Sequence, residues 1–140
     1  MSAPVEIRLA VAAEAAALLE LWGVAGSSAS NTDRLEYVAD TIEWPGSRVL
    51  VAISGDRLVG SLIATWDGWR GNMYRLAVLP EHRRQGIATA LVREGERLLL
   101  ELGSRRLVAI VLVEEPGAAA FWVRAGYVLQ REAGRFTKVQ

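Results

Sequence analysis

The segment from Pro80 to Thr89 has the residue types of a phosphate-binding turn. Two arginines, a glutamine and a glycine follow Pro80-Glu81-His82, and a long segment with helical periodicity starts directly after Gly86. The first backbone N–H groups of a helix lack intrahelical partners and the helix dipole is positive there, so the helix start attracts anions. Glycine lets an anion approach the backbone closely, and flanking arginines add charge. The sequence therefore predicts a pyrophosphate site formed by Arg83, Arg84, Gln85, Gly86, Ile87, Ala88 and Thr89.

The common nucleotide-binding motifs differ from this turn. It lacks the Gly-Lys-Ser/Thr ending of a P-loop and the triple glycine of a dinucleotide-binding turn. ATP and NAD are therefore poor candidates for the ligand.

Other site chemistries are limited by composition. Cysteine is absent and His82 is the single histidine, which excludes thiol nucleophiles, disulfides and cysteine-ligated metals. A histidine-based metal site is not expected, and we expect His82 in an exposed loop because no ligand set surrounds it.

Length and composition predict one globular domain over residues 1–140. The chain has 140 residues, of which 51% are hydrophobic and 23% charged. No apolar run reaches the roughly 18 residues of a membrane span, and the first residues do not resemble a secretory signal, so a cytoplasmic protein without membrane contact is expected. Residues 70–106 hold eight arginines against four acidic residues, but the formal net charge is zero and no aromatic-interleaved basic stripe occurs, so nucleic acid is not an expected partner.

The hydrophobic pattern predicts alternating strands and helices that can position this turn. Gly86–Leu102 carries a helical stripe, with Gly95 where close approach to a sheet is possible and Gly103 just past the end. The other expected helices are Ala12–Trp22, a segment capped by Thr32 or Asp33 and ending at Trp44, and Pro116–Ala125. The expected strands are Val5–Leu9, Arg48–Ser54, Arg57–Trp66, Met73–Leu79, Leu107–Val113, Tyr127–Arg131 and Phe136–Val139.

This order predicts an α/β (α+β) fold with a mixed, mainly antiparallel sheet of about seven strands and four helices. Leu107–Val113 is entirely apolar, which is typical of a strand buried on both faces, and the preceding helix makes it parallel to Met73–Leu79.

Two motifs resemble the GNAT family of N-acetyltransferases. Arg83-x-x-Gly86-x-Ala88, preceded by Leu76-Ala77-Val78-Leu79-Pro80, resembles that family's motif A, which holds the pyrophosphate of coenzyme A. Ala118-x-x-Phe121-Trp122-x-x-x-Gly126-Tyr127 resembles its later Ala-x-x-Phe-Tyr-x-x-x-Gly-Phe segment. The expected order of elements is also that of the family, so the resemblance covers most of the chain.

The resemblance implies an enzyme that transfers acetyl from acetyl-CoA to a primary amine, without a metal. The thioester would lie where Met73–Leu79 and Leu107–Val113 splay apart, with pantetheine paired to the backbone of Leu76, Ala77 and Val78. A backbone amide of that strand would stabilise the oxyanion, and an amine proton would pass to a carboxylate.

The sequence departs from the family at the positions that move protons. Trp122 stands where many members have a tyrosine that protonates the thiolate, and an indole is not an acid at ordinary pH. Glu115 stands at the position of a coenzyme-contacting asparagine. The strand positions that often hold an acidic base are Tyr74, Arg75 and Ile110 here. The catalytic residues are therefore unassigned, and the remaining candidates for proton transfer are Asp67, Glu114 and Tyr74.

Several alternatives remain open. The chain could be a non-catalytic acyl-CoA-binding regulatory module, and the acceptor could be a small amine, an amino acid, an antibiotic or a protein N-terminus. Gly86 could serve a tight turn alone, and the Glu114-Glu115 pair could supply a base or cap a helix. Trp66, Trp69 and Tyr74 could pack across strands rather than line a substrate pocket. A homodimer is a further possibility.

Overall fold

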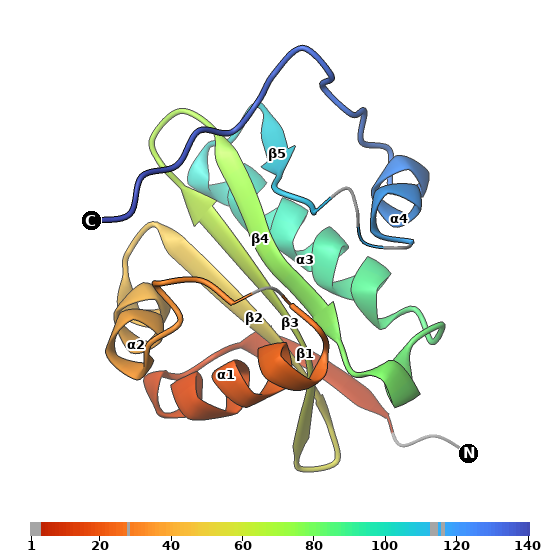
Figure 1. Ribbon diagram of the computed structural model, residues 1–140. Coiled ribbons are helices and arrows are strands. Elements are labelled where there is room, and N and C mark those ends of the chain that lie inside the picture. Colours follow the sequence, from red (N-terminus) through yellow and green to blue (C-terminus); the bar gives the residue numbers. More distant parts are fainter. Residues whose placement is uncertain (1–3, 28, 113–114, 116) are drawn as a thin grey trace.

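The computed structural model describes residues 4–27, 29–112, 115 and 117–140. A sheet with the strand order β1-β2-β3-β4-β5 forms its centre (Figure 1). The strands are β1 (Val5–Leu9), β2 (Ser47–Ser54), β3 (Arg57–Trp66), β4 (Gly71–Val78) and β5 (Leu107–Ala109). The first four pair antiparallel in sequence order, and β5 pairs parallel to β4.

Helices cover both faces of the sheet. α1 (Ala15–Val24) and α2 (Leu35–Glu43) lie on one face, and α3 (Ile87–Leu102) lies on the other (Figure 1). The remaining helices are α4 (Ala118–Arg124) and two short 3-10 turns, η1 (Ala12–Glu14) and η2 (Pro80–His82). No helix in the described part of the chain is long and apolar enough to cross a membrane.

The α3 helix packs closely on β3 at Gly95. A Cβ atom at this position would lie 2.7 Å from Cδ2 of Leu62 on β3, a distance at which Leu62 would have to move. The predicted ends are also confirmed, since Gly86 and Gly103 flank the helix in the left-handed conformation, with φ of 81° and 117°. Leu91 and Leu99 are fully buried against the strands. This packing fixes the start of α3 beside the end of β4.

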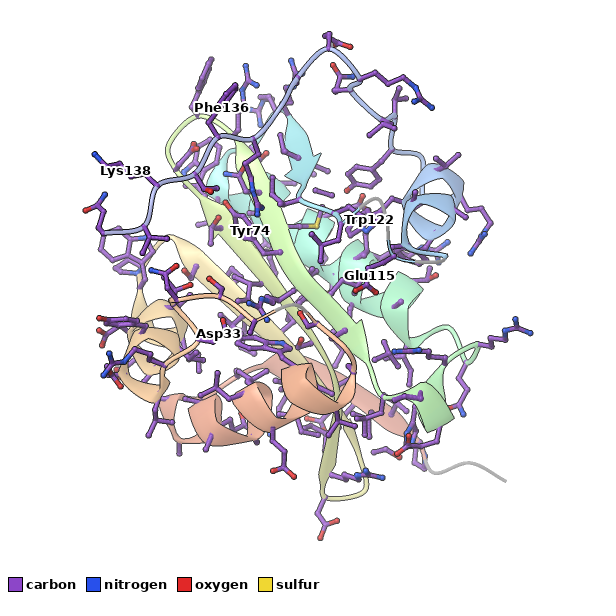
Figure 2. All side chains as sticks on the ribbon, viewed as in Figure 1. Asp33, Tyr74, Glu115, Trp122, Phe136 and Lys138 are labelled. Atoms are coloured by element: carbon purple, nitrogen blue, oxygen red, sulfur yellow. The ribbon has the colours of Figure 1, made fainter. Side chains whose placement is uncertain are left out.

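The prediction of about seven strands is wrong at the C-terminal end of the sheet. The described residues form five strands. β5 ends at Ala109 and its residues are half-buried, whereas a fully buried strand over Leu107–Val113 was expected; Val113 lies outside the described residues. The segments Tyr127–Arg131 and Phe136–Val139 are not strands, and the chain after α4 is irregular, with a turn closed by the bond from the amide of Ala133 to the carbonyl oxygen of Gln130 (Figure 1). Phe136, on this segment, is 98% exposed (Figure 2). A strand needs a hydrogen-bonded neighbour, and these segments have none among the described residues.

Two helix starts also differ. The α2 helix begins at Leu35, and its N-cap, Arg34, makes no side-chain capping bond, so the predicted cap by Thr32 or Asp33 is wrong. α4 begins at Ala118, and Pro116, the predicted first residue, lies outside the described residues.

Candidate functional site

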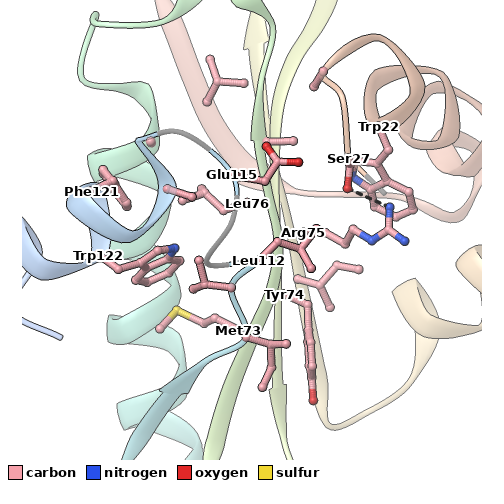
Figure 3. Close-up of a pocket in the computed structure, with 18 of the residues that line it drawn as sticks. Trp22, Ser27, Met73, Tyr74, Arg75, Leu76, Leu112, Glu115, Phe121 and Trp122 are labelled. Carbon is pink, nitrogen blue, oxygen red and sulfur yellow. Dashed lines mark hydrogen bonds between the residues drawn. The ribbon is translucent and has the colours of Figure 1, made fainter. Parts of the chain in front are cut away.

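A gap opens between β4 and β5 because their pairing stops early. The last paired residues are Met73 and Ala109, followed by one bond from the amide of Ile110 to the carbonyl oxygen of Met73. From Tyr74 to Val78, β4 has no β5 partner in the described part of the chain. A pocket of about 1270 Å³ extends from this gap across β4 to the loop between α1 and α2 (Figure 3).

Within the gap, the direction of the β4 backbone groups follows from the neighbouring pairs. The amide of Leu79 donates to Val59 of β3, and Ala77 pairs with Ser61 of the same strand. Since successive residues of a strand direct their backbone groups to opposite edges, Leu76 and Val78 direct theirs toward the gap. An extended amide-bearing ligand can therefore pair with Leu76 and Val78.

A β-bulge interrupts β4 next to these residues. The β3–β4 register shifts between Ser61 and Ile63, and Arg75 has a φ of 54°, in the left-handed region. The hydroxyl of Ser61 donates to the carbonyl oxygen of Arg75 at 2.8 Å and accepts a bond from the Trp22 indole N–H at 2.9 Å. Ser61 is fully buried, so these bonds hold the bulge from inside the core.

The start of α3 borders the same pocket and has the features of an anion site. The first intrahelical bond runs from the amide of Ala90 to the carbonyl oxygen of Gly86, and no side chain caps the helix. The amides of Ile87, Ala88 and Thr89 are therefore without helical partners. Nothing lies within 4 Å of a Cβ atom built on Gly86, so the space beside this backbone is open.

The two arginines before this helix are used differently. Arg83 donates through Nε to the carbonyl oxygen of Val78 at 3.1 Å and through a terminal nitrogen to that of Ala25 at 3.2 Å. It therefore ties the end of α1 to the end of β4. Arg84 has a φ of 62°, and its guanidinium makes no hydrogen bond or ion pair to the described residues. Arg84 is thus the arginine available to an anion.

The predicted binding residues come together around this pocket with one exception. Gln85 is exposed and does not line it. The residues that do are Leu76, Ala77, Val78, Arg83, Arg84, Gly86, Ile87, Ala88 and Thr89. His82 also lines the pocket; it is partly buried rather than in an exposed loop, and its Nδ1 is buried without a partner among the described residues.

Aromatic residues form the wall on the α4 side. Trp122 is 8% exposed and packs edge-to-face against Phe121 and Tyr127, with ring centroids 5.5 Å and 4.9 Å apart (Figure 3). The Tyr127 hydroxyl donates to Glu96 of α3 at 2.6 Å. The pKa of Tyr127 is raised above its usual value, mainly by burial and to a lesser extent by this contact with a carboxylate. Tyr127 therefore anchors α4 to α3 as a neutral phenol.

Of the three residues predicted as candidates for proton transfer, Tyr74 is the one that the described part of the structure places at the pocket. Asp67 lies outside the pocket and accepts bonds from the amides of Arg70 and Trp69 at 2.7 and 2.9 Å, which lower its pKa. It stabilises the β3–β4 turn rather than serving as a base. Tyr74 lines the pocket, and Glu114 lies outside the described residues.

Two carboxylates line the pocket: Asp33, which the sequence suggested only as a helix cap, and Glu115, which it suggested as a base or a cap. Asp33 pairs with Arg75, whereas no hydrogen bond or ion pair to the described residues is found for the Glu115 side chain (Figure 3). Neither is a cap, since α2 and α4 lack side-chain capping bonds. The Asp33–Arg75 contact joins residues 42 positions apart, so no local pattern could reveal it.

The remaining aromatic residues and potential metal ligands do not extend the site. Trp66 packs against the core, and Trp69 is 72% exposed beneath the guanidinium of Arg70, so the packing alternative holds for Trp66. In the described part of the chain, no three His, Asp or Glu side chains are grouped as metal ligands would be.

Comparison with known proteins agrees with this geometry. The sequence profile of the acetyltransferase (GNAT) family matches residues 15–127. N-alpha-acetyltransferase 30 of Schizosaccharomyces pombe is 30% identical over 99 residues, which cover 67% of this chain and 65% of that protein. The matched stretches cover between 43% and 65% of the curated relatives' own lengths.

Solved structures share the fold across nearly the whole chain. An aminoglycoside N-acetyltransferase AAC(6')-Iy in complex with CoA superposes with a TM-score of 0.82 at 14% identity, covering 99% of this chain and 97% of that one. A putative acetyltransferase from Agrobacterium tumefaciens str. C58 gives 0.79 at 17% identity, covering 95% and 99%.

Proposed function

Because the chain belongs to the acetyltransferase (GNAT) family, we propose that it transfers the acetyl group of acetyl-CoA to a primary amine. The observation that carries this proposal is the continuity between the open edge of β4 and the free start of α3. Pantetheine pairs with Leu76 and Val78 along β4, and the pyrophosphate lies on the amides of Ile87, Ala88 and Thr89 with Arg84 beside them. We also propose that residues 1–140 form one domain, which is supported by a core shared from Ala15 to Trp122.

The transfer needs one nucleophile and one place for the developing charge. The amine nitrogen attacks the thioester carbonyl carbon, forming a C–N bond and a tetrahedral oxyanion. The C–S bond then breaks, the electron pair leaves with sulfur as coenzyme A thiolate, and the amine proton passes to a base. A backbone N–H of β4 next to the bulge stabilises the oxyanion, and loss of such a donor typically costs about 3–4 kcal/mol.

We propose Glu115 as the acceptor of the amine proton, directly or through water. Its side chain lines the same pocket as Leu76 (Figure 3). Asp33, the other acidic residue among the described pocket residues, is held by Arg75. Trp122 supplies no proton, so the thiolate leaves without an acid at that position.

The charges around the pocket favour an acceptor with little positive charge. Among the described residues, the pocket has the carboxylates of Asp33 and Glu115, and the first is already neutralised. Five arginines line the same pocket: Arg75, Arg83, Arg84, Arg124 and Arg135. A polycationic aminoglycoside would meet repulsion here, and we propose the free N-terminus of a peptide as the acceptor. The relative from Schizosaccharomyces pombe is named an N-alpha-acetyltransferase, which supports this choice.

Calorimetric titration with acetyl-CoA, combined with thiol release on a panel of amines, tests the proposal. The panel contains peptides with free amino termini, the same peptides with blocked termini, single amino acids and an aminoglycoside. We expect release with the free peptides and none with the blocked ones. Binding without release for any amine would instead indicate a regulatory acyl-CoA-binding module, and absence of binding would refute the assignment of the site.

A further inference from the structure

The side chain of Arg75 leaves the strained bulge of β4 and reaches the loop between α1 and α2. One terminal nitrogen donates to Oγ of Ser27 at 3.0 Å, and the other donates to Oδ1 of Asp33 at 2.8 Å. The guanidinium carbon lies 4.8 Å from the centre of the Trp22 ring (Figure 3). One side chain therefore contacts the end of α1 and both sides of the following loop.

The ion pair between Arg75 and Asp33 is less exposed to solvent than an ion pair on the surface. The side chains of Arg75 and Asp33 are 17% and 20% exposed, compared with 63% and 55% for Arg34 and Glu36. Asp33 also accepts a bond from the amide of Ser30 at 3.1 Å. Since partial burial reduces screening and the contacts are multiple, the loop is held in one position by Arg75.

The backbone of Arg75 forms part of the bulge of β4, so Arg75 connects this bulge to the α1–α2 loop. A left-handed conformation costs a non-glycine residue free energy and persists only where its surroundings hold it. Here Ser61 holds the carbonyl group, and the loop holds the guanidinium. If the loop moved away, one of the two restraints on the bulge would be lost.

We infer that Arg75 is a positioning residue that couples the α1–α2 loop, which borders the pocket, to the acyl site. Ser27, Ser30 and Asp33 line the pocket on the loop side, and Leu76 follows Arg75 on the open edge of β4. Ordering of the bulge by a bound thioester therefore also orders the loop, and the two halves of the site form together. This inference rests on the proposed function, because it assigns acetyl-CoA to the edge of β4.

Hydrogen exchange with and without acetyl-CoA tests the coupling. Arg75→Met keeps the aliphatic part of the side chain and removes the guanidinium group. In the wild-type protein, acetyl-CoA should slow exchange of the segments 71–78, 83–89 and 25–34, the last by about fivefold, at the low end of coupling between sites. In Arg75→Met, the first two segments should still be slowed, and exchange of 25–34 should no longer respond. Arg75→Lys should restore part of the response.

Arg8→Met is the matched control. Arg8 makes a comparable two-point contact with Glu14, at 2.9 and 2.7 Å, and neither residue lines the pocket. Its response to acetyl-CoA should equal that of the wild-type protein. If Arg75→Met does not fold, Asp33→Asn removes the negative charge from the same contact and should reduce the response of 25–34.

Two results would separate the claims. Slowing of 25–34 in Arg75→Met or Asp33→Asn to the wild-type extent would overturn the coupling while leaving the acetyl-CoA site intact. Absence of slowing in every segment of the wild-type protein would instead refute the acetyl-CoA site itself.

Discussion

Trp22 and Arg75 are connected twice, once through the side chain and once through the backbone. The guanidinium of Arg75 lies 4.8 Å from the Trp22 ring centre, and the Trp22 N–H reaches the carbonyl oxygen of Arg75 through the hydroxyl of Ser61. A helix and a strand bulge are thereby fixed to each other by a closed set of contacts. The open edge of β4 beside Leu76 depends on this set.

Ser61→Ala should destabilise the protein by about 2 kcal/mol or more. It leaves the N–H of Trp22 and the carbonyl of Arg75 without their partner in the core, and each unsatisfied buried group costs about 1–3 kcal/mol. Urea unfolding measures the change. Ser104→Ala is the control, because Ser104 is also buried, at 3% exposed, and its hydroxyl donates only to Arg106 among the described residues. Equal losses in the two variants would contradict a special role for the Ser61 bonds.

Gly86→Ala should reduce affinity for acetyl-CoA by about tenfold, or about 1.4 kcal/mol. The added methyl group would stand in the open space beside the α3 amides, and the φ of 81° would become strained. Gly55→Ala places the same group in open space at a φ of 65°, in the β2–β3 turn away from the pocket. Both variants should lose about 1 kcal/mol of stability. Calorimetry should show weakened binding in the first variant alone; unchanged affinity would refute the phosphate assignment.

Arg84→Gln should weaken acetyl-CoA binding and make it less dependent on salt. The guanidinium of Arg84 is not bonded to the described residues, and removing it takes one positive charge from the anion site. Titrations at low and high ionic strength measure both effects. Arg93→Gln removes an equal charge from the exposed face of α3 outside the pocket, and its affinity should match the wild-type value. Equal weakening in both variants would indicate a diffuse effect of net charge.

Trp122→Tyr should add an alkaline limb to the pH–rate profile. A phenol with a pKa of about 10 can protonate the departing thiolate while it is neutral, and this help is lost as pH rises through the pKa. The acetylation rate with a peptide acceptor from pH 7 to 11 measures it. Trp122→Phe provides an aromatic ring without an acidic proton and should lack the limb. Identical profiles for the two variants would show that position 122 does not face the sulfur.

Local signals were sufficient for the elements nearest the phosphate turn. The ends of α3 follow from Gly86 and Gly103, which supply left-handed backbone, and from an apolar stripe that ends between them. The bounds of β1 and β3 match the prediction, and those of β3 follow from the turn residues on either side, Gly55-Asp56 and Asp67-Gly68. The closeness of α3 to β3 was also predictable, since Gly95 lies within the buried stripe.

The tertiary structure alone decided how far the sheet extends and what holds the site. Tyr127–Arg131 and Phe136–Val139 have the composition of strands, but β5 is too short to offer them an edge, and a strand forms only with a partner. The contacts of Trp22 with Ser61 and of Arg75 with Asp33 join residues 39 and 42 positions apart. Sequence periodicity describes neighbours along the chain, so it identified the residues of the phosphate turn, whereas the bulge and its restraints arise only when distant segments pack.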